Sequence, residues 1–155
     1  GPIVNPSQPK CQLLGVANLD QMRLYNNVYR KIGIDYAIEN SIEGYDEISL
    51  TGNFKITTND YERIFSPADI GMQQTQASEL MGGETKEDAM RIFDSVLANT
   101  ATESQKNVVI TNAAFAIQVM ERGKKSIDEC IAIARESLES GRAEETLKKF
   151  IEINN

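Results

Sequence analysis

The segment from about Ser104 to Glu121 constrains the fold most, because apolar residues occur on nearly every side of the helix that its spacing predicts. A helix of this kind needs packing partners around it, so we expect it in the middle of the domain. The chain has 155 residues, enough for a hydrophobic core, and no linker or internal repeat divides it, so residues 1–155 are predicted to form a single unit. The apolar positions of the segment are Val108, Val109, Ala113, Ala114, Phe115, Ala116, Ile117, Val119 and Met120.

The first part of the chain predicts a strand, a helix and a second strand. Gln12 to Val16 is a short apolar run typical of a buried strand. Asn18 can cap a helix that begins at Leu19, and Gly33 can end it. Asp35 to Glu39 then predicts the second strand.

The middle of the chain changes character and leads into several helices. From Ile48 to Phe65, apolar residues alternate with Thr, Gly, Asn and Asp, which predicts short strands with turns at Gly52-Asn53 and Asn59-Asp60. The later helices are expected after Thr85, from Ser104, after Ser126 in an S-x-x-E capping box, and from Ala143. We therefore predict an α/β fold in which few strands are covered by several helices, with part of the sheet contributed from upstream.

Composition excludes several kinds of function. The absence of histidine excludes Ser-His-Asp and Cys-His catalysis and histidine-bound zinc from this chain. With 23 acidic against 16 basic residues and a net charge of −7, unaided nucleic-acid binding is not expected. The only two cysteines, Cys11 and Cys130, are far apart, which favours a reducing cytoplasm. Neither a signal peptide nor a membrane-spanning segment is predicted.

Two adjacent acids, Asp46 and Glu47, follow a glycine turn and precede the predicted strand start Ile48-Ser49-Leu50. Magnesium in proteins is usually held by one or two carboxylates together with substrate phosphates and water, so this pair is a candidate metal site. Taken alone, the pattern is more typical of a solvated acidic turn.

Residues 1–10 hold three of the four prolines and are predicted to form an extended loop, which opens with Gly1 to Pro6. Its Asn5 amide can either contact a ligand or hold the loop in shape, and in isolation a plain connecting loop is the simpler interpretation.

Taken together, these segments resemble the C-terminal part of anthranilate phosphoribosyltransferase, which belongs to a nucleoside phosphorylase/phosphoribosyltransferase-like α/β class. The likeness follows the order and spacing of its motifs from end to end. The motifs are Gly1-Pro2-Ile3-Val4-Asn5-Pro6, Gln12-Leu13-Leu14-Gly15-Val16, Tyr45-Asp46-Glu47-Ile48-Ser49-Leu50-Thr51-Gly52, Gly82-Gly83, Asn112-Ala113-Ala114, Ala134-Arg135-Glu136-Ser137 and Ser140-Gly141.

The resemblance implies a glycosyltransferase of tryptophan biosynthesis, which transfers the phosphoribosyl group of phosphoribosyl pyrophosphate to anthranilate and releases pyrophosphate. It implies that Asp46 and Glu47 hold Mg²⁺, and that Gly1, Pro2, Asn5 and Pro6 line the acceptor side. No residue of this chain is assigned a catalytic role. A cytoplasmic homodimer is implied for the complete protein, with an N-terminal helical domain and further site residues upstream.

Three functions remain open from the sequence. The family's Gly-rich phosphate loop and acceptor-binding arginine have no counterpart here, so the chain alone is predicted to be inactive. Besides the anthranilate enzyme, a related nucleoside phosphorylase-like enzyme with another acceptor fits the same fold. A non-catalytic binding module that kept the fold is the third possibility, and in it Asp46 and Glu47 would have no role.

Overall fold

The computed structural model describes residues 2–154. A four-stranded mixed sheet lies at the centre of the fold. The strand order is β1-β2-β3-β4, with β1 parallel to β2 and the other neighbours antiparallel. The predicted α/β fold with few strands and several helices is confirmed. The strands are β1 (Cys11–Gly15), β2 (Asp35–Ser41), β3 (Phe54–Thr58) and β4 (Glu62–Phe65).

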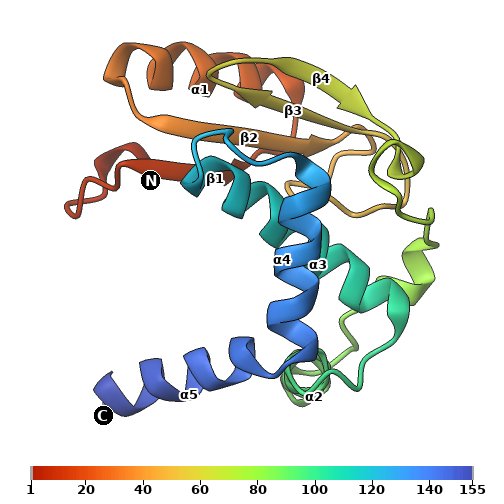
Figure 1. Cartoon of the computed structure of the whole chain (residues 1–155). Coiled ribbons are helices and arrows are strands. Elements are labelled where there is room, and N and C mark those ends of the chain that lie inside the picture. The colour runs from red at the N-terminus through yellow and green to blue at the C-terminus, as the bar shows by residue number, and fades with distance from the viewer. Residues whose placement is uncertain (1, 155) are drawn as a thin grey trace.

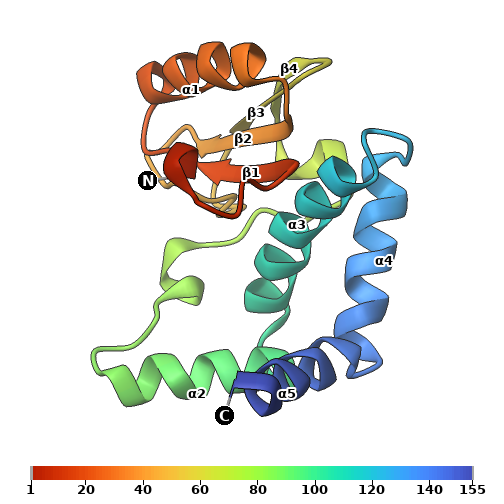
Figure 2. The ribbon, with the colours of Figure 1, turned by 90° about the vertical axis from the view of Figure 1, so that its left-hand side faces the viewer.

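Helix α1 (Leu19–Ile32) links the two parallel strands and covers one face of the sheet, as Figures 1 and 2 show. Its start and end are those predicted, because the Asn18 side chain accepts from the Gln21 amide and Gly33 adopts the left-handed conformation that ends the helix. Tyr29 and Met22 of α1 are buried against the sheet. The strand-helix-strand start of the chain is therefore confirmed.

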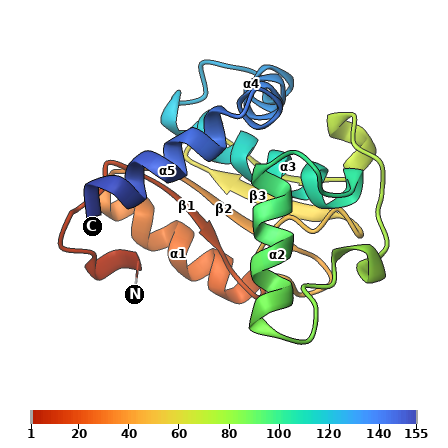
Figure 3. The same ribbon diagram turned by 90° about the horizontal axis from the view of Figure 1, so that it is seen from below.

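The opposite face of the sheet carries the helical part of the chain. Helix α3 lies against β1 and β2, and α4 packs along α3. Helices α2 and α5 lie at the end of this layer that is remote from the sheet (Figure 2), and they stand in front of the sheet when it is viewed from below (Figure 3). The helices are α2 (Lys86–Leu97), α3 (Glu103–Met120), α4 (Ile127–Glu139) and α5 (Arg142–Asn154), and the 3₁₀ turns are η1 (Pro2–Val4), η2 (Pro67–Ile70) and η3 (Ala77–Leu80).

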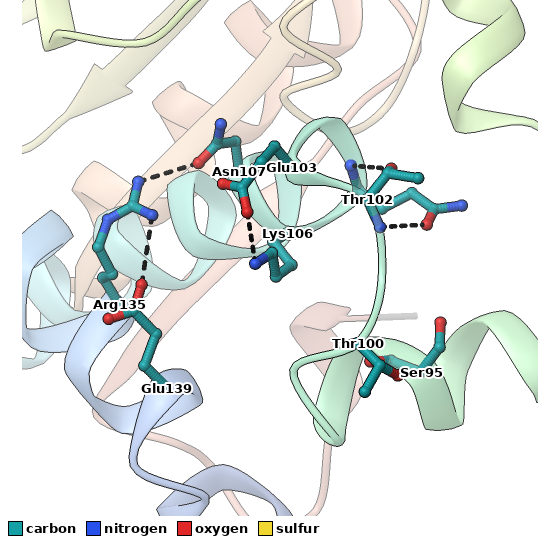
Figure 4. Close-up of polar contacts among 9 residues, drawn as sticks. Ser95, Thr100, Thr102, Glu103, Lys106, Asn107, Arg135 and Glu139 are labelled. Atoms are coloured by element: carbon teal, nitrogen blue, oxygen red, sulfur yellow. Dashed lines mark hydrogen bonds and ion pairs between the residues drawn. The ribbon is translucent and has the colours of Figure 1, made fainter.

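Polar contacts fix the amino end of α3 (Figure 4). Thr102 and Gln105 form a reciprocal capping box, which satisfies backbone groups that the first turn leaves without helical partners. One turn further on, Arg135 of α4 donates to Asn107 of α3 at 2.9 Å and lies 3.7 Å from Glu139. The bond between Arg135 and Asn107 joins α4 to α3, whereas the capping box and the Arg135–Glu139 pair each lie within one helix.

The prediction that α3 is buried on nearly all sides is only partly right. Ile110, Ala114 and Phe115 are fully buried, whereas Val109 and Met120 are exposed. The sheet and α4 cover two sides of the helix, and the remaining side faces outward among the described residues. In the part of the chain that the structure describes, no helix combines the length and apolar content needed to span a membrane.

Three phenylalanines form the centre of the larger core. Phe54 and Phe65 stack with their ring centroids 5.6 Å apart, and Phe115 of α3 meets both rings edge-on at 5.9 and 5.8 Å. Such offset and edge-on arrangements are favourable for aromatic rings and join the sheet to the helical layer.

Replacing Phe115 by alanine should lower the free energy of unfolding by about 3–5 kcal/mol, because it leaves a cavity between the sheet and α3. Urea unfolding followed by circular dichroism measures this change. The matched control is Phe93→Ala on α2, where the ring is 54% exposed, and a change of about 0.5 kcal/mol is expected. Equal losses in the two variants would contradict the packing described here.

Candidate metal centre

The acid pair lies at the edge of the sheet where the parallel strands end. Because β1 and β2 run in the same direction, Gly15 and Ser41 finish at one edge. Residues 42–53, named here the acidic loop, leave this edge and connect β2 to β3. In open α/β sheets, ligands bind beyond the carboxyl ends of the strands, so the loop occupies the position expected of a ligand site.

The backbone of the acidic loop lies directly on Gly15. A Cβ atom built on this glycine would be 1.6 Å from the carbonyl oxygen of Asp46, a distance that no side chain can tolerate. Only glycine therefore permits the loop to approach β1 so closely. This contact fixes the height of Asp46 above the end of the strand.

Helix α3 holds the loop from the other side through the side-chain amide of Asn112. The Ile48 backbone N–H donates to Oδ1 of Asn112 at 3.0 Å, and Nδ2 of Asn112 donates to the Ile48 carbonyl at 2.9 Å. Ile48 itself is fully buried, so these bonds satisfy backbone groups that water does not reach. The Asn112 side chain thus pairs with the residue next to Glu47 as a neighbouring strand would.

A chain of hydroxyl groups supports the loop from within. Ser41 donates from Oγ to the Glu47 carbonyl at 2.6 Å, and its Oγ lies 3.1 Å from that of Ser49. The Ser49 Oγ is 2.7 Å from Oγ1 of Thr51, which in turn donates to the Glu43 carboxylate. The polar network restrains the conformation of the loop.

The predicted strand start at Ile48-Ser49-Leu50 is wrong. Residues 48–50 lie outside the strands, and Leu50 adopts a positive φ of 59°, which is rare for a bulky side chain. Leu50 is fully buried, and its carbonyl accepts from the Thr75 amide at 3.0 Å, so tertiary contacts hold it in this conformation. The contacts of Ile48 and Leu50 outweigh the local strand preference of these apolar residues.

The side chains of Asp46 and Glu47 face outward from this fixed backbone. Both residues are exposed, and neither carboxylate has a hydrogen bond or an ion pair with any residue in 2–154. Among those same residues, no three His, Cys, Asp or Glu side chains are arranged as a cage for a metal ion. The pair therefore suits a cation that takes its other ligands from phosphate oxygens and water, which is the habit of Mg²⁺.

A third acid, Glu39, lies buried in β2 beside this pair. It is only 4% exposed, and its Oε2 has no hydrogen-bond partner among the described residues. Burial raises the pKa of Glu39 to about 8, and the neighbouring carboxylates of Glu47 and Asp46 add to this increase. Three carboxyl groups therefore lie close together at the loop, and the two exposed ones suit a divalent cation.

The predicted acceptor loop lies at the opposite edge of the sheet (Figure 1). Pro2–Val4 form the 3₁₀ turn η1, so the predicted loop is not extended throughout. Asn5, with Ile34 just before β2, lines a cavity of about 410 Å³. Oδ1 of Asn5 accepts from both the amide and the hydroxyl of Ser7, so this side chain shapes its own loop. Pro6 follows in the same loop, whereas Gly1 lies outside the described residues.

A family model described as "Glycosyl transferase family, a/b domain" matches residues 1–144 of this chain. The chain belongs to this glycosyl transferase family. The anthranilate phosphoribosyltransferase of Phocaeicola vulgatus is 57% identical over 155 residues, which are 100% of this chain and 46% of the relative. The resemblance found in the sequence is thereby confirmed, and the chain spans about half the length of the curated relatives it matches.

Solved structures show the same fold for this glycosyl transferase chain. Anthranilate phosphoribosyltransferase from Saccharomyces cerevisiae in complex with 4-fluoroanthranilate superposes with a TM-score of 0.85 at 23% identity, covering 98% of this chain and 45% of that one. The same yeast enzyme in complex with PRPP and Mg gives a TM-score of 0.81 at 23% identity, with coverage of 98% and 44%. The α/β architecture is therefore that of the family.

Several residues that build the centre were not assigned a role from the sequence. Asn112 is a polar residue within an apolar helix, and Glu39 is an acidic residue at the end of the segment predicted as the second strand. A polar residue within a run that must be buried was the available signal in both cases, because such a residue needs a specific partner. The hydroxyl chain of Ser41, Ser49 and Thr51 gave no signal, since these residue types are ordinary in turns.

Asn112→Ala should free the acidic loop, because it leaves the buried N–H and carbonyl of Ile48 without partners at a cost of about 1–3 kcal/mol for each group. Hydrogen exchange measured by mass spectrometry should show faster exchange at residues 48–50. Asn107→Ala is the matched control, since Asn107 lies on the same helix but bonds Arg135 instead of the loop. Unchanged exchange in the Asn112 variant would show that the amide does not hold the loop.

Proposed function

We propose that the complete protein containing this chain transfers the phosphoribosyl group of phosphoribosyl pyrophosphate to anthranilate and releases pyrophosphate. The observation that carries this proposal is that Asp46 and Glu47, on a rigidly held loop, make no hydrogen bond or ion pair through their carboxylates with residues 2–154. The chain is also 57% identical to a protein named anthranilate phosphoribosyltransferase. Two yeast structures of that name, one with PRPP and Mg and one with an anthranilate analogue, support the choice of substrates.

In this proposal Asp46 and Glu47 hold Mg²⁺. When bound, the ion supplies positive charge that stabilises the pyrophosphate leaving group. The chain's own part is to present two carboxylates at a fixed height above the sheet, and Gly15, Asn112 and Ser41 achieve this through the contacts described above. Positioning of this kind lowers the barrier because the groups need not reorganise during the reaction.

The acceptor-side assignment of Gly1, Pro2, Asn5 and Pro6 stays a prediction of the resemblance. Since the opening loop and the acid pair lie at opposite edges of the sheet, the proposed magnesium site does not include the loop. The site is completed by residues that this chain does not supply.

We further propose that the complete protein is a cytoplasmic homodimer, as the resemblance implies. The two cysteines support the reducing compartment, because both are free thiols and Cys130 is buried.

Replacing both acids, Asp46→Asn with Glu47→Gln, should lower kcat of the complete enzyme roughly 100-fold or more, because the departing pyrophosphate loses its cation. Steady-state release of pyrophosphate from phosphoribosyl pyrophosphate and anthranilate measures the loss. The matched control replaces another adjacent acid pair, Glu144 and Glu145 of α5, by glutamine and should leave turnover unchanged. Full turnover in the double variant at positions 46 and 47 would instead favour the non-catalytic role of the pair.

The 155-residue chain alone should show no turnover at saturating Mg²⁺ and substrates, because the phosphate-binding residues of the family have no counterpart in it. The assay is the same, with the complete enzyme as the positive control. Robust activity of the chain alone would place the whole active site within residues 1–155 and contradict the proposed division.

A further inference from the structure

Glu39 is a carboxylic acid that the fold buries without giving it a partner. Glu39 is 4% exposed, and among residues 2–154 its Oε2 accepts no hydrogen bond and no lysine or arginine pairs with it. A buried carboxyl group without a partner lowers stability, and several apolar side chains of similar size would fill the same space at less cost. The residue therefore needs an explanation outside packing.

The register of the sheet places Glu39 beside the acid pair. Glu39 of β2 lies opposite Gly15 of β1, and residues opposite each other in a sheet project from the same face. The direction in which a Gly15 side chain would project is occupied by the backbone of Asp46. The Glu39 side chain thus projects from the sheet next to Asp46, beneath the acidic loop.

On its face of the sheet, Glu39 lies between the apolar core and the polar Ser41, and its partner on β3 is the buried Ile56. Ala37, two residues earlier on β2, is on the same face and belongs to the core that also contains Phe115 of α3. In such surroundings a charge interacts with its neighbours far more strongly than it would in water. The nearest charged groups are Asp46 and Glu47, which are also negative and act together with burial to raise the pKa of Glu39. A divalent cation at the pair would offset the repulsion among the three acids.

We propose that Glu39 is the buried positioning carboxylate of the magnesium site, strengthening the hold of Asp46 and Glu47 on the ion through its own negative charge. This inference rests on the proposed function, since it takes the acid pair as the ligands. The three acids do not form a direct cage, so Glu39 acts on the ion from behind the ligands. Groups placed behind metal ligands commonly change metal affinity 10- to 100-fold.

The test is Mg²⁺ binding by the complete protein, measured by isothermal titration calorimetry. Glu39→Gln keeps the size of the side chain and removes its charge, and it should weaken Mg²⁺ binding roughly tenfold. Asp60→Asn makes the same change of charge at an exposed turn of the opposite edge and should leave affinity unchanged. Glu39→Asp keeps the charge and should bind Mg²⁺ more tightly than Glu39→Gln.

A second readout separates this role from a purely structural one. Without magnesium, Glu39→Gln should melt no lower than the unsubstituted protein, because glutamine matches the size of a buried carboxyl group that has no hydrogen-bond partner among the described residues. The rise in melting temperature on adding Mg²⁺ should be smaller in this variant, since a ligand stabilises in proportion to its occupancy. A structural role predicts the opposite pattern, a lower melting temperature without metal and an unchanged affinity.

The outcomes distinguish the two proposals. If the double variant at Asp46 and Glu47 loses Mg²⁺ while Glu39→Gln binds it with unchanged affinity, the role of Glu39 is overturned and the proposed function stands. If Glu39→Asp and Glu39→Gln bind Mg²⁺ equally weakly, charge is not the cause and the role is likewise overturned. If the double variant binds Mg²⁺ as tightly as the unsubstituted protein, the acid pair is not the site and both proposals fail.

Discussion

The two hydrogen bonds between Asn112 and Ile48 are the constraint on which the candidate centre depends. They join the middle of α3 to the acidic loop, which otherwise has no secondary structure of its own between β2 and β3. A loop without such support would lose conformational entropy each time it bound a ligand. Because α3 is packed on the sheet and on α4, the amide transfers the rigidity of the core to the acid pair.

The close approach of the loop to Gly15 and the grouping of three carboxyl groups both follow from that constraint. With the loop drawn against α3 and β1, its backbone approaches Gly15 too closely for any other residue, and the neighbouring Glu39 is covered. Three carboxylates then lie near one edge of the sheet, two of them facing water and one facing the core. Bringing three carboxyl groups together is unfavourable, and in the function proposed above a divalent cation would offset that cost.

Much of the fold could be predicted because local signals and packing agree. Asn18 and Gly33 bound α1 as expected, and the capping box of Ser126 opens α4 as expected. The apolar pattern of α3 was misleading because apolar residues lie all round the helix and do not show which side faces outward. The exposure of Val109 was therefore not foreseen. The conformation at Leu50 was missed because a single positive φ, held by long-range contacts, leaves no trace in local residue types.

The sequence predicted the two adjacent acids of the candidate centre, but it did not predict their geometry. Motif resemblance pointed to Asp46 and Glu47, but the support from Asn112 spans 64 positions of the sequence and no local pattern specifies it. Glu39 is opposite Gly15 in the sheet, and neighbouring residue types likewise did not predict its burial.

The most direct test is a crystal structure of the complete protein with phosphoribosyl pyrophosphate and Mn²⁺, located by anomalous scattering, in place of magnesium. The account predicts a Mn²⁺ ion coordinated by carboxylate oxygens of Asp46 and Glu47 and by the ligand's phosphates. An ordered ion bound to the phosphates but held by other residues, with Asp46 and Glu47 directed into solvent, would contradict it.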